Sequence, residues 1–345
     1  MFGMEGYISK AEFSERAGAI KLRVQMAVVA VGALLMCAKF AAFLFTNSAA
    51  ILTDAMESIV NVVAGLVSLY GIRLASRPKD SDHPFGHGKI ELVSASVEGL
   101  LILAAGVAIV CEGAARLISP AEIERLDMGL AVVALAGVAN FLMGSVSIHF
   151  GRKYGSMALI AGGKHLHSDT YSTIGLVAGL LAVSLTGAVW IDSAVAVLFG
   201  LLIISAGVGV LRKTIANLTD EADEGRLKKL LKTVSDYREN DWIDVHNLKV
   251  ISYGSDIFVD CDLTMPFFYT IERGHEVSES LKAAICGAFE GNVLVSIHFD
   301  SCARAHCSHC ELADCQHRRE PFSGSQSLTM REITGSDEFM SENKI

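Results

Sequence analysis

Long runs of apolar residues alternate with short polar connections through the first two thirds of the chain. Six of these runs are long enough for an α-helix to cross the hydrocarbon core of a bilayer, which takes about 20 residues. They lie at about 24–46, 49–72, 93–115, 128–150, 157–187 and 189–211. The pattern predicts an integral membrane protein with six transmembrane helices within residues 1–213.

The pattern changes after Lys213 to shorter elements of mixed polarity. Apolar and polar residues alternate clearly in 257–265, as in a strand with one buried face. The expected elements are a helix at 221–236, strands at 245–252 and 256–265, a helix at 273–289 and a strand at 293–299. Residues 214–301 are therefore expected to form a small α+β domain of the order αββαβ, ferredoxin-like, with its helices on one face of the sheet.

Charge separates the same two regions. The chain is 51% hydrophobic and 19% charged, with a mean hydropathy of +0.42, which excludes a disordered, collagen-like or coiled-coil protein. The net charge of −9 divides into +1 for residues 1–213, −8 for 214–300 and −2 for 301–345. Because phosphate binding needs a basic surface, the acidic second half argues against nucleic acid as a partner.

Basic residues lie mostly on one side of the predicted membrane. One side has Arg116 and Arg125 alone. The other has Lys10, Arg16, Lys21, Arg23, Arg73, Arg77, Lys79, Lys89, Arg152, Lys153, Lys164, Arg212 and Lys213. Since positively charged connections stay in the cytoplasm, we expect both termini to be cytoplasmic. No signal peptide is expected, because the polar residues 1–23 lack a short apolar segment and a cleavage site.

Ionisable residues interrupt two of the apolar runs. Glu57 and Asn61 are spaced i, i+4, and so are His165 and Asp169, which places each pair on one helix face. If the two faces meet, an imidazole, an amide and two carboxylates offer ligands for a divalent transition metal. The alternative is that these groups form hydrogen bonds between helices. Because charge in a membrane is costly, two matched pairs favour a functional site.

Cysteines concentrate in the tail, residues 302–345. Four of the eight have the spacing C-x4-C-x2-C-x4-C: Cys302, Cys307, Cys310 and Cys315, with His306, His309 and His317 nearby. In a reducing cytosol this favours thiolate binding of Zn²⁺, with an iron–sulfur cluster or redox-sensitive thiols as alternatives. The others, Cys37, Cys111, Cys261 and Cys286, are expected in the core. Beyond Phe322 we expect disorder.

The loop after the second run reads Pro78-Lys-Asp-Ser-Asp-His-Pro-Phe-Gly-His-Gly-Lys89. With the two i, i+4 pairs, this string resembles the cation diffusion facilitator family, over about residues 10–302. The resemblance implies a homodimeric, proton-coupled exporter of divalent metal ions. An enzyme is not expected, because no nucleophile, phosphate loop or paired-acid arrangement accompanies the metal ligands.

The resemblance also implies roles for particular residues. The transport site falls on Glu57, Asn61, His165 and Asp169, and a second metal site in the loop falls on Asp80, His83 and His87. A binuclear site in the cytoplasmic domain, which also dimerises, falls on His246, Asp262, His275, His298 and Asp300. Lys89 and Asp220 match a charge contact near the membrane surface of the dimer.

The transport site departs from the family pattern. Family members usually have Asp or His at the first position and Asp at the second, where this chain has Glu57 and Asn61. Less ligand charge implies weaker binding or a different metal preference, and one proton-accepting group fewer. His165 is expected to couple proton binding to metal binding. An unperturbed histidine has a pKa of about 6.5, so a proton and a metal ion compete for its imidazole near neutral pH. The alternative is a metal sensor, scaffold or heterodimer partner without transport.

The ligands suit Zn²⁺, Fe²⁺, Co²⁺ or Ni²⁺, of which Zn²⁺ is expected as substrate and regulator. Two acidic domains of charge −8 repel within a screening length of about 8 Å, so bound cations would draw them together. The location expected is a bacterial inner membrane.

Overall fold

The computed structural model describes residues 3–46, 49–118, 127–186, 190–253, 256–289, 292–324 and 328–335. The chain forms two compact units, which are described separately. One is Glu12–Thr219, and the other contains Asp220–Ile345 together with Met1–Ala11.

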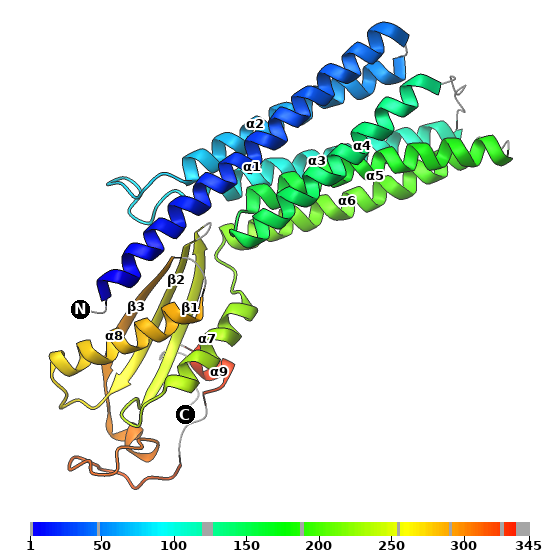
Figure 1. The fold of residues 1–345 in the computed structure, drawn as a ribbon. Helices are drawn as coiled ribbons and strands as arrows, with labels where there is room; N and C mark the ends of the chain where they lie inside the picture. Colours follow the sequence, from blue (N-terminus) through cyan, green and yellow to red (C-terminus); the bar gives the residue numbers. More distant parts are fainter. Residues whose placement is uncertain are drawn as a thin grey trace. The chain divides into compact units, whose positions relative to one another are not determined.

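The helical unit is made of long helices that run side by side (Figure 1). They are α1 (Gly3–Thr46), α2 (Ala49–Ala75), α3 (Ile90–Ile118), α4 (Asp127–Lys153), α5 (Met157–Thr186) and α6 (Trp190–Leu218). Within the described residues, all of these except α5 contain an apolar stretch long enough to cross a membrane. The 30-residue α5 carries Lys164, His165, His167 and Asp169 in its first half. The predicted fold class is confirmed: membrane-spanning helices precede a small α+β domain.

The surface of the helical unit is apolar. In α1, Leu34 is 69% exposed, Leu44 78% and Phe45 86%. Exposure on this scale is unfavourable in water but suits contact with lipid tails. Buried positions hold smaller groups, such as Ala55 and Ala158. Apolar groups thus lie on both the inside and the outside of this unit, and small residues at helix contacts let the helices pack closely, as expected in a bilayer.

Glycines let pairs of helices approach closely. A Cβ atom added at Gly106 of α3 would lie 2.9 Å from the backbone nitrogen of Ile204 and 3.1 Å from the carbonyl oxygen of Gly200, both in α6. One added at Gly144 of α4 would lie 2.7 Å from the carbonyl oxygen of Gly163 in α5. These contacts are too short for any larger residue, so the α3–α6 and α4–α5 pairs depend on glycine.

The second unit contains a three-stranded sheet with two helices packed against it (Figure 1). Its elements are α7 (Glu224–Tyr237), β1 (Asp244–Tyr253), β2 (Asp256–Met265), α8 (Ile271–Ala288) and β3 (Val293–Ser301). The strand order is β1-β2-β3, with β1 antiparallel and β3 parallel to β2. The core includes Leu230 of α7, Leu263 of β2 and Leu281 of α8, all fully buried. These elements follow the predicted order αββαβ.

Both helices of this domain begin at residues with a side-chain cap. The Asp223 carboxylate accepts a hydrogen bond from the backbone N–H of Arg226 (3.0 Å), and the Thr270 hydroxyl accepts one from that of Arg273 (3.2 Å). Each cap pairs a backbone donor that the first turn of a helix leaves free. The local sequence therefore sets where α7 and α8 start.

The tail differs from the expectation of disorder beyond Phe322. Residues 330–333 form the short helix α9 (Met330–Ile333), and Ile333 is fully buried in the core of the domain. The Gly335 carbonyl accepts a hydrogen bond of 2.8 Å from the backbone N–H of Asn247 in β1. Composition was misleading here, because a single buried isoleucine and one added backbone hydrogen bond hold the segment on the domain.

The close α3–α6 packing leads to a prediction for Gly106→Ala. The added methyl group has no space against the α6 backbone, so we expect a loss of about 1–3 kcal/mol in stability, as in other overpacked sites. Gly209→Ala in α6 is the matched control, because nothing lies within 4 Å of its Cβ position. Thermal unfolding of both variants in detergent measures the difference, and equal melting temperatures would show that this contact is not limiting.

Candidate functional site

Asn61 of α2 joins two residues of α5 inside the helical unit. Its Nδ2 donates a hydrogen bond of 2.7 Å to Asp169 Oδ2, and its Oδ1 lies 2.9 Å from His165 Nε2. For Asn61 Oδ1 to accept, the proton of the His165 ring must be on Nε2. His165 is buried, and its Nδ1 has no hydrogen-bond partner in the described part of the chain. The structure thus brings together three of the four residues of the predicted transport site.

Glu57, the fourth residue, lies one turn before Asn61 in α2. Its side chain falls outside the described residues. Helical spacing alone places Glu57 on the same face as Asn61, so its participation in the site stays a prediction.

Glu98 of α3 is a buried carboxylate close to this cluster that the sequence analysis did not single out. Its Oε1 accepts a hydrogen bond of 3.1 Å from the Ser68 hydroxyl of α2, while Oε2 has no hydrogen-bond partner among the described residues. A Cβ atom at Gly162, one turn before His165 in α5, would lie 3.7 Å from Glu98 Oε1. The available signal was a glutamate near the start of the apolar run 93–115, which also contains Glu112 near its end.

Further buried polar groups lie along α2 and α3. Gln25 of α1 donates a hydrogen bond of 2.9 Å to the carbonyl oxygen of Gly65, one turn after Asn61. Lys21 of α1 and Glu91 of α3 form an ion pair of 3.0 Å, with side chains 5% and 2% exposed. Both charges are paired, as charges buried in a membrane protein must be. Buried polar contacts thus join α1 to α2 and to α3.

The loop between α2 and α3 brings its three candidate ligands together. Asp80 Oδ1 lies 3.1 Å from His83 Nδ1, and Asp80 Oδ2 lies 3.3 Å from His87 Nε2. One ligand atom from each of the three residues lies within 4.8 Å of the other two, so a single metal ion could contact all three. His87 is buried, whereas Asp80 and His83 are exposed. The cluster is open to solvent on one side.

Local backbone geometry keeps the Asp80 carboxylate charged. The backbone N–H of His83 donates to Asp80 Oδ1 at 2.7 Å, and this hydrogen bond is the main reason that the pKa of Asp80 lies below its usual value. The side chain of His83 and the nearby His87 ring lower it further. A permanently ionised carboxylate beside two imidazoles is a suitable ligand set for a divalent transition metal.

A second cluster lies in the α+β domain. His246 Nε2 lies 3.6 Å from Asp300 Oδ2 and 4.0 Å from Asp262 Oδ2, and its Nδ1 lies 3.2 Å from Asp244 Oδ2. His298 Nε2 joins through Asp300 Oδ1 at 3.5 Å. The structure thus gathers four of the five residues predicted for this domain.

His275, the fifth, is placed differently. It is exposed on α8 and does not belong to the group of ligand atoms found in the described structure, which consists of His246, Asp262 and Asp300. The sheet therefore supplies the observed cluster, and the contribution of His275 stays a prediction.

Strand register explains how residues far apart in the sequence lie side by side across the three strands. His246 pairs with Asp262 across β1 and β2, and Asp262 pairs with His298 across β2 and β3. A bulge after His246 includes Asn247 at a φ of 52°, a conformation that asparagine tolerates better than most residues. The Asn247 side chain donates a hydrogen bond of 2.7 Å to Asp262 Oδ2. The bulge thus orients one carboxylate of the cluster.

Lys89 and Asp220 lie in different units, Lys89 in the helical unit and Asp220 at the start of the other. Their charge contact stays a prediction.

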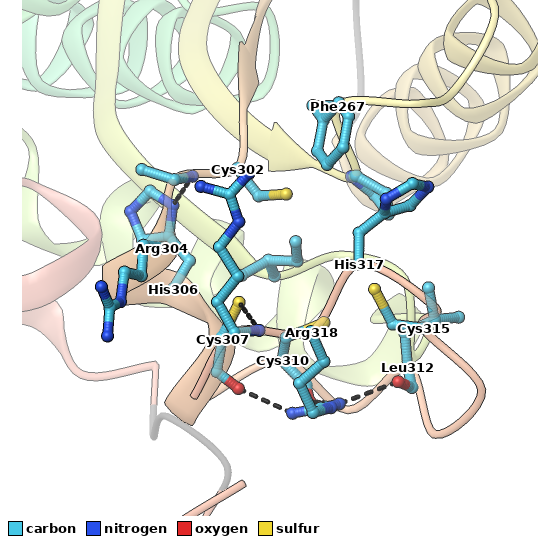
Figure 2. A pocket seen from close by; sticks show the side chains of 14 residues that line it. Phe267, Cys302, Arg304, His306, Cys307, Cys310, Leu312, Cys315, His317 and Arg318 are labelled. Atoms are coloured by element: carbon cyan, nitrogen blue, oxygen red, sulfur yellow. Dashed lines mark hydrogen bonds between the residues drawn. The ribbon is translucent and has the colours of Figure 1, made fainter. Parts of the chain in front are cut away.

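The four cysteines of the tail lie together, whereas the other cysteines are spread over both units. Cys302, Cys307, Cys310 and Cys315 line one pocket of the tail together (Figure 2). Cys261 lies in the core as expected, where burial raises its pKa to about 12, so it remains a neutral thiol. Cys37 and Cys111 are exposed on α1 and α3, contrary to the expectation that they lie in the core. Their apolar neighbours reflect a lipid-facing surface instead.

Comparison with known proteins covers both units. Residues 25–219 match the model of the cation efflux transmembrane domain, and residues 220–302 match that of the cation efflux protein cytoplasmic domain. An uncharacterized transporter, sll1263, of Synechocystis sp. is 31% identical over 77% of this chain and 86% of its own length.

The cation-efflux pump FieF of Escherichia fergusonii is 28% identical, and that of Citrobacter koseri is 27% identical; each alignment covers 83% of this chain and 94% of the relative. The agreement extends through the helical unit, with its polar cluster on α2 and α5, and through the α+β domain. The chain therefore belongs to the cation diffusion facilitator family of cation-efflux membrane transporters.

Proposed function

We propose that this protein exports divalent transition-metal cations from the cytoplasm in exchange for protons, by alternating access. The transport site is Glu57, Asn61, His165 and Asp169, and Zn²⁺ is the expected substrate. The observation that carries this proposal is the hydrogen-bonded cluster of Asn61, His165 and Asp169 between α2 and α5. Uncharged hydrogen-bonding residues would suffice to hold two helices together, whereas this cluster combines an imidazole and a carboxylate.

Metal binding must compete with the hydrogen bonds of the cluster. Asn61 now uses its amide oxygen toward His165 and its amide nitrogen toward Asp169. A cation between the helices would take the Asn61 oxygen, the His165 nitrogen and the Asp169 oxygen as ligands, which are donor types that Zn²⁺ accepts. With Glu57 and Asp169 ionised and His165 neutral, the ligand charge of −2 matches a divalent cation. Release of the ion would re-form the hydrogen bonds seen here.

Glu98 offers a replacement for the proton-accepting group that Asn61 lacks. Its unpartnered Oε2 is buried, and its Oε1 lies against α5 one turn from His165. An unpaired carboxylate in such surroundings is costly, and a bound proton removes that cost. His165 and Glu98 together could therefore exchange protons as a divalent charge enters and leaves the neighbouring site.

The α+β domain is proposed to sense cytoplasmic metal in a homodimer. The domain matches the family model of a dimerising cytoplasmic domain. Its charge of −8 over residues 214–300 opposes the approach of two copies. The cluster of His246, Asp262 and Asp300 lies at the sheet, where a cation would neutralise part of this charge. Bound metal would thus favour the closer arrangement, which is a shift between two populated states.

The membrane is proposed to be a bacterial plasma membrane, because the cation-efflux pumps that this chain resembles are bacterial proteins. The basic connections between the helices support a cytoplasmic location for both termini. This orientation brings the domain that senses metal to the side from which metal is exported.

A metal sensor or heterodimer partner without transport is the second candidate. The neutral Asn61 favours it, because the site has fewer charged ligands than is usual in the family. Vesicles that contain the purified protein distinguish the two functions, since a sensor binds metal without moving it.

Asn61→Asp tests the transport site. The variant adds a negative charge next to Asp169, so we expect metal to bind about tenfold more tightly, because affinity rises with ligand charge, and the metal preference to change. The measurement is metal uptake into proteoliposomes under a pH gradient, with Zn²⁺, Fe²⁺, Co²⁺ and Ni²⁺ compared. Unchanged KM and preference would show that Asn61 is not a ligand.

Glu98→Gln tests the proton role. The amide keeps the size of the side chain and an acceptor for Ser68 but cannot bind a proton, so pH-driven transport should slow about tenfold or more, equivalent to about 1.4 kcal/mol in the barrier. Its dependence on pH should flatten, while metal affinity at a fixed neutral pH stays within about twofold. Glu112→Gln is the control, because Glu112 lies on an exposed face of α3, where it forms an ion pair of 2.8 Å with Arg116. A wild-type pH profile in Glu98→Gln would contradict this role.

His246→Ala tests metal sensing. Adding Zn²⁺ to the full-length dimer should shorten the distance between spin labels at the exposed position 228 of α7, and the variant should reduce that shortening because the cluster loses its imidazole. Glu272→Gln, an exposed change on α8, is the control. If the wild-type distance does not respond to Zn²⁺, metal does not draw the domains together.

A further inference from the structure

The start of the tail is fixed to the end of the sheet. The backbone N–H of Cys302 donates a hydrogen bond of 2.8 Å to the carbonyl oxygen of Met265, the last residue of β2. The chain then forms a short 3₁₀ turn at Arg304–Ser308 that contains Cys307. One cysteine is therefore held by the rigid domain, and the next follows after a single tight turn.

The four tail cysteines surround one pocket. Its volume is about 260 Å³ and its lining includes Cys302, Cys307, Cys310 and Cys315 (Figure 2). Cys310 is 6% exposed, and the other three are partly buried. Thiols separated by 13 residues in sequence thus line one pocket because the tail folds back on itself. In the described structure no three of their sulfur atoms lie within 4.8 Å of one another, so a bound ion would have to draw them closer.

Hydrogen bonds from the Arg318 side chain to backbone carbonyl oxygens hold this fold. The Arg318 guanidinium donates to the carbonyl oxygens of Cys307 (2.7 Å), Cys310 (2.9 Å) and Leu312 (2.8 Å). The backbone N–H of Arg319 points to Cys307 Sγ at 3.5 Å. A positive side chain and an N–H donor next to the sulfurs both favour negative charge in the pocket.

The neighbouring histidines have other contacts. The Nδ1 atom of His306 accepts a hydrogen bond of 3.0 Å from the backbone N–H of Ala303. His309 Nδ1 lies 3.1 Å from the Gly324 carbonyl oxygen, so it acts as the donor. The His317 ring packs against Phe267 and Phe268 at 5.0 and 5.2 Å between ring centres. The thiols, rather than the imidazoles, are the matched set.

We propose that Cys302, Cys307, Cys310 and Cys315 bind one Zn²⁺ as a closed, four-thiolate structural site. The four thiols release their protons as the metal binds. Four thiolates around Zn²⁺ carry a net charge of −2, which the Arg318 side chain next to the pocket partly offsets. All four coordination positions are filled by protein, as in other structural zinc sites.

This site would cross-link the part of the tail that connects β3 to α9. Cys302 directly follows β3, and the tail continues to α9, where Ile333 is fully buried in the core of the domain. A metal ion that joins the four cysteines shortens the free length between these two anchors. The bound Zn²⁺ is a permanent part of the domain and is not exported, so the inference is independent of the proposed function.

Metal analysis of the full-length protein tests the site. Protein purified under reducing conditions and washed with chelator should retain about one Zn²⁺ per chain, as a closed structural site does. Replacing all four cysteines by serine should remove that ion. The control Cys37→Ala/Cys111→Ala removes two exposed thiols of the helices and should keep it. No retained metal in the wild type, or iron in place of zinc, would overturn the proposal.

Reconstitution with Co²⁺ identifies the ligands even if the four-serine variant fails to fold. Thiolate coordination gives a sulfur-to-cobalt charge-transfer band in the near ultraviolet, which oxygen and nitrogen sites in the rest of the protein do not give. Cys315→His keeps a ligand, so it should bind Co²⁺ with a weaker charge-transfer band. A spectrum identical to that of the wild type would exclude Cys315 as a ligand.

Discussion

The cost of placing charge in a membrane governs the arrangement of the helical unit. Lys21 and Glu91 are both almost fully buried, and they pair with each other across α1 and α3. Asp169 and His165 meet the same requirement through Asn61, whose amide donates to one and accepts from the other. An amide can satisfy an anion and an imidazole at once, which a carboxylate cannot. Asn61 thus stabilises the cluster through these hydrogen bonds, and its oxygen is the ligand that we propose for a bound cation.

This stability has a chemical consequence for transport. A neutral residue between the two helices lowers the charge available to attract a cation and leaves fewer groups to carry protons. Oε2 of Glu98 is a neighbouring carboxylate oxygen that has no hydrogen-bond partner among the described residues. Because Ser68 and Glu98 lie on α2 and α3, a change in the packing of α2 against these neighbours would act on the proposed metal ligands and the proposed proton acceptor together.

The α+β domain handles charge in water, where the cost is lower and metal can act as a regulator. Its acidic groups are gathered by strand register, and the bulge at Asn247 orients Asp262 within the cluster. For the tail we propose a different use of metal chemistry. There, four thiols are positioned by an arginine that binds three carbonyl oxygens. Two roles of metal in one domain are consistent with the different ligands, since carboxylate and imidazole allow exchange and four thiolates retain the ion.

Much of the architecture could be predicted from local sequence patterns. Apolar runs identified the helices, alternation identified the strands, and the i, i+4 spacing placed Asn61, His165 and Asp169 on helix faces. These features depend on residues near one another in the chain, so periodicity alone reveals them. Glu98, the exposed position of His275 and the docking of Ile333 depend on which elements pack together, and no local pattern carries that information. The sequence determined the elements and their ligand-bearing faces, whereas tertiary packing decided which of those groups are buried, paired and within reach of one ion.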